Sequence, residues 1–209
     1  MLGTSSRCAN RSHVNVLIIG GTRFLGRHLV NELLAGGHSV TLFNAGAHPQ
    51  NAPADVEQVH GKRERDLARL GERSWDAVVD TCGFLPKQLE TSTRYLLGKA
   101  AQYVFISSVS ALDLTKESAN EQTPTLPMPN GASRSEMIPE THGPLKALCE
   151  GVVTSAFRNH ALIVRPGLIV GPYDPTDRFT YWPARVARGG TVLAPVDPGY
   201  FVQFIDFAI

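Results

Sequence analysis

Six short segments, five of them mostly apolar, alternate with segments of helical periodicity, and this alternation restricts the fold more than any other feature of the chain. Runs such as VNVLII and DAVVD are typical of strands buried on both faces. The predicted strands span Val14–Ile19, Ser39–Phe43, Val56–His60, Asp76–Asp80, Tyr103–Ser107 and Ala161–Arg165. The predicted helices span Phe24–Leu34, Asp66–Arg73, Pro86–Gly98 and Gly143–Asn159, the last with Pro144 in its first turn. We therefore expect an α/β fold, with a doubly wound parallel sheet and helices on both faces.

Composition and charge exclude several classes of protein. Of 209 residues, 43% are hydrophobic and 19% are charged, and the net charge is +1. Such a balance gives no electrostatic footprint for nucleic acid or for an anionic membrane surface. No apolar run approaches the length of a membrane span. The cysteines, Cys8, Cys82 and Cys149, lack metal-binding spacing, so we expect no metal site and a reducing, cytoplasmic environment.

Changes in composition along the chain divide it into three parts. Residues 1–13 are polar and lack the apolar core of a secretory signal, which indicates a disordered leader. Residues 14–170 carry the alternating pattern, interrupted by a long polar loop at 113–139. Residues 171–209 are rich in proline and aromatic residues, and they end inside an apolar run. We interpret this last part as the start of a smaller domain that is incomplete.

The segment IIGGTRFLG places Gly20, Gly21 and Gly26 between the first predicted strand and helix. Glycines there let the backbone approach a pyrophosphate, which the amino end of the helix attracts, so the segment predicts a dinucleotide site. Arg23 occupies the place of the usual middle glycine, and its side chain either stands over the phosphates or points to solvent. The second strand ends in Asn44, which is neither the acid expected for NAD nor the arginine expected for NADP, so both coenzymes stay open.

Together with this loop, five further motifs resemble the short-chain dehydrogenase/reductase superfamily, in particular its extended and atypical members, the NAD-dependent epimerases/dehydratases. The motifs are GGTRFLG (20–26), WDAVVDTCG (75–83), YVFISSVS (103–110), HGPLK (142–146), RPGLIVGP (165–172) and VQFID (202–206). The resemblance implies a Rossmann domain that binds NAD or NADP, over residues 14–170. It also implies a small carboxyl-terminal domain for the substrate, which is often a nucleotide sugar, and catalysis by a Ser or Thr, a Tyr and a Lys.

Carried over residue by residue, the resemblance assigns Ser108 to the catalytic hydroxyl, with Ser107 as the neighbouring alternative, and Lys146 to the catalytic lysine. Lys146 would hold the nicotinamide ribose and favour deprotonation of the nearby acid/base. Cys82 would be a small packing residue beside the cofactor. The expected cofactor contacts are Gly20, Gly21, Thr22, Arg23, Phe24, Leu25, Gly26, Asn44, Cys82, Gly83, Lys146, Pro166 and Gly167.

Two substitutions depart from the family pattern. Lys62 stands where the family usually has an acidic contact to adenine, and His142 stands where it has the catalytic tyrosine. An imidazolium at position 142 would face Lys146 and the nicotinamide charge, so we expect the neutral imidazole to dominate. Imidazole is also shorter than phenol by roughly 2 Å, and a misplacement of about 1 Å can cost on the order of a hundredfold in rate. We expect weakened or altered redox chemistry, unless His142 only packs or caps at the helix start.

These motifs lead to two functional hypotheses, and the ending at Ile209 motivates a third, a truncated and inactive remnant. The first is an NAD(P)-dependent epimerase, dehydratase or reductase acting on a sugar-like alcohol, with Ser108, His142 and Lys146 as its catalytic set. The second is a non-catalytic dinucleotide-binding or RNA-binding protein, because the GGTRF-type loop resembles that of the chloroplast stem-loop RNA-binding proteins; the near-zero charge argues against RNA. Family members often pair through two helices of the Rossmann domain, so a homodimer through Pro86–Gly98 and Gly143–Asn159 is an alternative to a monomer.

Overall fold

The computed structural model describes residues 13–114, 119–193 and 203–206, and all six predicted strands are present in it. They form one parallel sheet in the order β3-β2-β1-β4-β5-β6. The strands are β1 (Asn15–Ile19), β2 (Ser39–Asn44), β3 (Glu57–His60), β4 (Trp75–Asp80), β5 (Ala100–Ile106) and β6 (Ala161–Val164). The order reverses direction between β1 and β4, so the carboxyl ends of these two strands open the crevice in which such sheets bind ligands.

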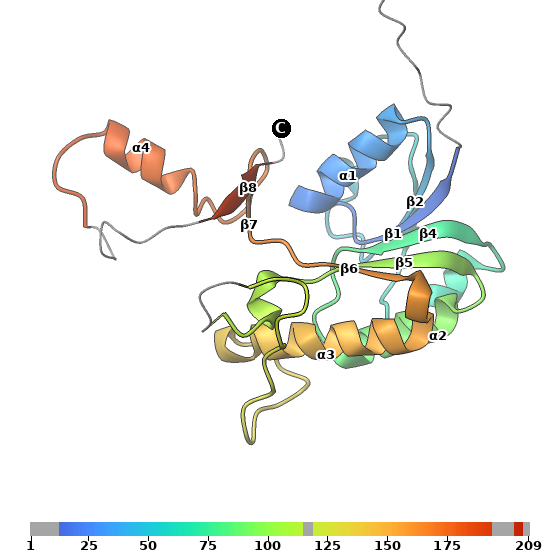
Figure 1. Cartoon of the computed structure of the whole chain (residues 1–209). Helices are drawn as coiled ribbons and strands as arrows, with labels where there is room; N and C mark the ends of the chain where they lie inside the picture. Colours follow the sequence, from blue (N-terminus) through green and yellow to red (C-terminus); the bar gives the residue numbers. More distant parts are fainter. Residues whose placement is uncertain (1–12, 115–118, 194–202, 207–209) are drawn as a thin grey trace, which may run out of the picture.

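Helices cover both faces of the sheet, which confirms the predicted α/β fold (Figure 1). Helix α1 (Phe24–Ala35) lies on one face, and α2 (Pro86–Leu96) and α3 (Pro139–Phe157) lie on the other. Successive residues of each strand point to opposite faces, so β1 contributes to two separate cores. Its residues Val16 and Ile18 pack with the α1 side, whereas Leu17 and Ile19 pack with the α2 and α3 side.

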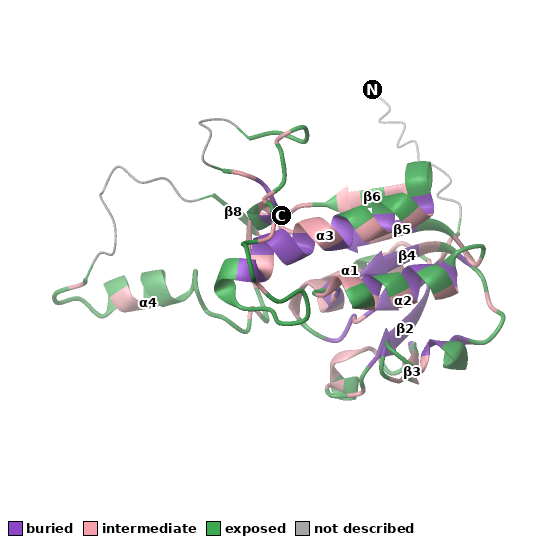
Figure 2. Cartoon of the chain, turned by 90° about the horizontal axis from the view of Figure 1, so that it is seen from below, coloured by how far each residue is buried: buried purple, intermediate pink, exposed green. Residues whose placement is uncertain are grey.

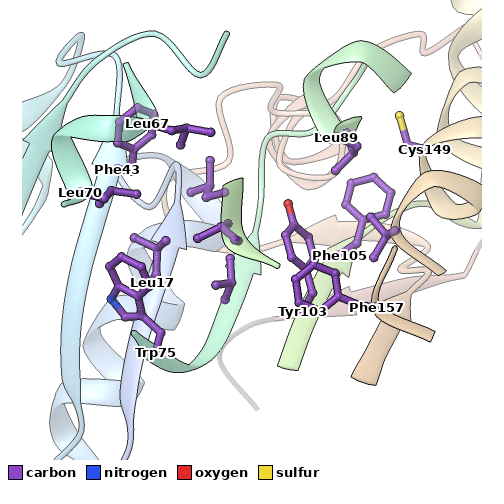
Figure 3. Packing of buried hydrophobic residues seen from close by; sticks show 14 residues of the cluster. Leu17, Phe43, Leu67, Leu70, Trp75, Leu89, Tyr103, Phe105, Cys149 and Phe157 are labelled. Atoms are coloured by element: carbon purple, nitrogen blue, oxygen red, sulfur yellow. The ribbon is translucent and has the colours of Figure 1, made fainter. Parts of the chain in front are cut away.

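The larger core lies between the sheet and the helices α2 and α3. It contains Leu89 from α2, Phe157 from α3, and Tyr103 and Phe105 from β5, all at most 5% exposed (Figure 3). Seen from the side of α2 and α3, the buried residues follow the contact between these helices and the strands beneath them (Figure 2). The side chains on both faces of the central strands are therefore shielded from water, as their apolar sequences predicted.

Helix α3 begins at Pro139, four residues before the predicted start, and this corrects the position of Pro144. Pro139 takes the first helical position, and the Oγ1 of Thr141 accepts a hydrogen bond of 3.0 Å from the backbone N–H of Ile138. Pro144 lies inside the helix and gives no hydrogen bond to the carbonyl of Glu140. Glu140 is exposed, so water can satisfy that carbonyl.

Among the residues that the structure describes, four short 3-10 segments connect the main elements, and one of them corrects a second prediction. The segment predicted as a helix at Asp66–Arg73 forms only η2 (Leu67–Leu70), because Gly71 adopts a positive φ of 68° directly after it. The others are η1 (Pro49–Asn51), η3 (Val109–Ala111) and η4 (Arg158–His160). In the described ranges, no helix is long and apolar enough to cross a bilayer.

Beyond β6 the chain leaves the main sheet. It forms β7 (Leu168–Val170), α4 (Tyr181–Ala187) and β8 (Phe204–Asp206), and β7 pairs with β8 in a separate two-stranded parallel sheet. Most of the predicted leader, residues 1–12, lies outside the described residues. Strand β6 is one of the two edge strands of the main sheet, and β3 is the other. On β6, Leu162 is 48% exposed and Val164 is 37% exposed.

Candidate functional site

The loop from β1 to α1 has the backbone geometry that a diphosphate requires. Gly20 and Gly21 have φ values of 103° and 89°, which favour glycine over any other residue. A Cβ on Gly26 would lie 2.6 Å from the Cα of Gly21, so helix and loop can approach this closely only without a side chain. The loop joins the sheet directly to the amino end of α1, where backbone N–H groups attract anions. These residues therefore fit a dinucleotide.

The remaining predicted contacts of the loop, Thr22 to Leu25, lie between these glycines. The carbonyl of Thr22 accepts a hydrogen bond of 3.0 Å from the Asn51 side chain, which ties the loop to η1. Arg23 is exposed and immediately precedes α1, a position compatible with both interpretations of its side chain. Phe24 and Leu25, the first two residues of α1, are half-buried.

Asn44, at the end of β2, is buried and held by its own turn. Its Oδ1 accepts hydrogen bonds from the backbone N–H of Gly46 (2.8 Å) and from Nδ1 of His60 (3.1 Å). The amide oxygen thus stabilises the turn that follows the strand. The residue type is compatible with either coenzyme, and the choice between NAD and NADP stays open.

The end of β4 contains a buried ion pair that the sequence did not reveal. The guanidinium of Arg63 donates to both carboxylate oxygens of Asp80, at 2.6 and 2.7 Å, and to Sγ of Cys82 at 3.1 Å. Asp80 is fully buried and also accepts a hydrogen bond of 2.8 Å from the Tyr103 hydroxyl. Burial alone would lower the pKa of Arg63, but the Asp80 carboxylate outweighs this and raises it. The pair thus contacts Cys82, which with the following Gly83 is one of the predicted cofactor contacts.

Cys82 and Gly83 lie in the turn that follows β4. Burial raises the pKa of the Cys82 thiol more than the neighbouring Arg63 lowers it, so the thiol stays protonated and is a poor nucleophile. A Cβ on Gly83 would lie 2.8 Å from the side chains of both Leu89 and Phe105. The backbone at position 83 can therefore pass this close to the core only as glycine.

Lys146 is buried, at 4% exposure, and is not a solvated helix lysine. Its Nζ donates hydrogen bonds of 2.8 Å to the carbonyls of Gly83 and Ile106, at the ends of β4 and β5. An ammonium has three donors, so these two contacts leave one for a ligand at the same edge. Burial lowers the pKa of Lys146, and Asp80 opposes that shift.

Ser108 and His142 lie on two segments that pack together, η3 and the start of α3. Ser108 caps η3: its Oγ accepts a hydrogen bond of 3.1 Å from the backbone N–H of Ser110. Gly143 lies so close to η3 that a Cβ there would be 2.0 Å from the carbonyl oxygen of Ser110. His142 is therefore fixed beside the turn that Ser108 caps, one helical turn before Lys146.

His142 is half-buried, and burial is the main reason that its pKa is lowered; the charge of Lys146 lowers it further. The neutral imidazole is thus favoured, with one ring nitrogen able to donate and the other to accept.

This pKa shift predicts how stability depends on pH. The unfolded chain binds a proton at His142 near its ordinary pKa of 6.5, before the folded protein does. As the pH falls through 6.5 toward the folded pKa, the wild type should lose stability relative to His142→Gln. Urea unfolding of both proteins at several pH values measures this difference. A constant difference between them at every pH would contradict the prediction.

Pro166 and Gly167 follow β6 and lie beside η3, where the carbonyl of Pro166 accepts a hydrogen bond of 3.0 Å from the backbone N–H of Val109. A cavity of about 1150 Å³ adjoins them on the outer side of β6. Its lining includes Val109, Leu112, Arg165, Gly167, Leu168 and Phe204. The described residues contain no group of three or more His, Cys, Asp or Glu side chains that could hold a metal ion.

The structure thus brings the predicted residues to the edge formed by the carboxyl ends of the strands. It also adds five residues that the sequence prediction missed: Arg63, Asp80, Tyr103, and the ion-paired Glu150 and Arg165. Asp80 offered one signal. It directly follows the apolar residues Ala77–Val79 of a strand, so its carboxylate needs a buried partner.

Comparisons with known proteins agree with this geometry. The profile of the NAD dependent epimerase/dehydratase family matches residues 16–198. The structure of UDP-glucose 4-epimerase from Thermotoga maritima, solved with UDP-glucose, superposes with a TM-score of 0.63 at 18% identity, covering 93% of this chain and 70% of that one. The Bordetella bronchiseptica enzyme WbmG, solved with NAD, gives a TM-score of 0.55 at 16% identity, covering 78% and 55%.

A curated relative has a different description. The chloroplast stem-loop binding protein of 41 kDa b from Arabidopsis thaliana is 33% identical over 46% of this chain, and the match spans 30% of that protein's length. The family profile covers most of the present chain, and the fold and the glycine loop fit it. The chain belongs to the NAD-dependent epimerase/dehydratase family.

Proposed function

We propose that the protein binds NAD or NADP and acts as an epimerase, dehydratase or reductase on a sugar-like alcohol, with a nucleotide sugar as the favoured substrate. The observation that carries this proposal is the glycine loop at the amino end of α1, which lies at the same edge of the sheet as Ser108, His142 and Lys146. Solved structures of the same fold hold NAD or UDP-glucose. The bound nicotinamide would supply a reversible acceptor for hydride from a carbinol carbon.

In this proposal the chain's own residues position the alcohol and move its proton. The Ser108 hydroxyl, which in this structure donates to the Ser110 hydroxyl at 3.1 Å, would turn to donate its hydrogen bond to the substrate oxygen. Neutral His142 accepts the alcohol proton on a ring nitrogen, directly or through one water molecule, which compensates for the shorter reach of imidazole. Lys146 holds the ribose with its remaining donor, and its charge favours the neutral form of His142.

Calorimetric titration with NAD, NADH, NADP and NADPH tests the first part of this function. We expect heat of binding for at least one coenzyme, together with thermal stabilisation that grows with its concentration. If none of the four binds, the enzymatic proposal fails.

His142→Tyr tests the second part. The phenol restores about 2 Å of reach, so we expect turnover of an accepted nucleotide sugar to rise on the order of a hundredfold, with little change in coenzyme affinity. Steady-state rates for a panel of nucleotide sugars measure this effect. Wild-type turnover as fast as that of the variant would contradict the idea that His142 weakens the chemistry.

A second candidate function is RNA binding without catalysis, and the similarity to the chloroplast stem-loop binding protein favours it. The net charge of +1 argues against it, because phosphate contacts need a surplus of lysine and arginine on one face. A salt-dependent mobility shift of stem-loop RNA, without coenzyme binding, would support this second function.

A further inference from the structure

Glu150 is a buried carboxylate on the same face of α3 as His142 and Lys146. It lies one helical turn beyond Lys146 and is 5% exposed. Its Oε1 accepts hydrogen bonds from the Ser107 hydroxyl at 2.5 Å and from Nε of Arg165 at 3.0 Å, and its Oε2 accepts one from the same guanidinium at 2.7 Å. The two-point contact with arginine fixes the orientation of the carboxylate as well as its charge.

These contacts join the ends of two neighbouring strands. Ser107 directly follows β5 and Arg165 directly follows β6. Backbone hydrogen bonds connect the same two segments, from Ser107 N–H to the Val164 carbonyl at 2.7 Å and from Val109 N–H to the Pro166 carbonyl at 3.0 Å. Ser108 lies between the two bonded amides. Its position relative to Pro166 therefore depends on how firmly these two strand ends are held together.

We propose that Glu150 is a positioning residue, which holds Ser108 and the Pro166–Gly167 turn in one geometry through Ser107 and Arg165. This role rests on the proposed function, because Ser108 and Pro166–Gly167 are the assigned substrate and nicotinamide contacts. Glu150 itself touches Ser107 and Arg165 rather than the reacting groups. Its removal should loosen one local junction, while the phosphate loop on the far side of β4 keeps its structure.

The test uses Glu150→Gln and Ser107→Ala, with Glu140→Gln as the matched control. Glu140 lies on the same helix but is exposed. Hydrogen exchange is followed in the ligand-free protein. We expect the amides of Ser107 and Val109 to exchange on the order of tenfold faster in both variants, and β1 and β2 to exchange at the wild-type rate. Ser107→Ala removes only the hydroxyl that donates to Glu150. It therefore tests the same junction even if Glu150→Gln folds poorly.

The same variants are then titrated with NADH and assayed for turnover. We expect the coenzyme Kd to change less than about threefold, because the phosphate loop is remote, and kcat to fall while KM stays similar. Unchanged exchange at Ser107 and Val109, or faster exchange spread equally over β1 and β2, would overturn the positioning role. If the wild type takes up no coenzyme, the proposed function fails instead, and the exchange rates still decide whether Glu150 holds this junction.

Discussion

Replacing Arg63 with methionine is expected to lower the free energy of unfolding by about 3–5 kcal/mol, because it leaves the Asp80 carboxylate buried without its charge partner. Arg63 and Asp80 are 6% and 0% exposed in their side chains, and two hydrogen bonds join them. Urea denaturation at neutral pH measures the loss.

Two controls separate the ion pair from the loss of a long side chain. Arg69→Met removes an exposed arginine that lies 3.8 Å from Asp66 and donates an exposed hydrogen bond of 2.9 Å to the His60 carbonyl, and it should cost less than about 1 kcal/mol. Adding Asp80→Asn to Arg63→Met removes the stranded charge and should recover much of the stability. If Arg63→Met and Arg69→Met cost the same, the buried pair does not stabilise the end of β4.

Gly143→Ala should have the largest effect on the site itself. The added Cβ would lie 2.0 Å from the carbonyl oxygen of Ser110, a backbone atom that cannot turn aside like a flexible side chain. Helix α3 must separate from η3, so we expect a loss of stability of about 1–3 kcal/mol. His142 and Lys146 would shift relative to Ser108, and a displacement of about 1 Å can reduce turnover on the order of a hundredfold.

The matched control is Gly151→Ala, on the same helix. A Cβ there meets nothing within 4 Å, and alanine forms helices better than glycine, so stability should rise by up to about 1 kcal/mol. Thermal unfolding and turnover of both variants provide the comparison. Wild-type behaviour of Gly143→Ala would show that α3 and η3 do not need this close contact.

Local sequence patterns were sufficient to predict the sheet and the loop at α1. Apart from β3, the strands of the main sheet are mostly apolar runs, and Gly20, Gly21 and Gly26 mark the turn by their residue type alone. The start of α3 was predicted too late, because Pro144 looks like a first-turn proline although Pro139 takes that place. Local pattern could not distinguish the two prolines, since both have a fixed φ.

The site contacts that were missed depend on residues far apart in the chain. Arg63 and Asp80 are 17 residues apart, and Ser107 and Glu150 are 43 apart, so no periodicity connects them. Lys146 lies at this edge of the sheet, and the two carbonyls that hold it belong to β5 and the turn after β4. Only the crossovers of a folded sheet bring such groups within hydrogen-bonding distance.

The outer position of β6 has a consequence for how the protein behaves in concentrated solution. In the described part of the chain, no strand pairs with the outer side of β6, where Leu162 and Val164 are exposed. An open strand with apolar side chains is a template for backbone pairing with another molecule. This edge is therefore a point at which molecules can aggregate, and a covering segment or an added charge there would protect the protein.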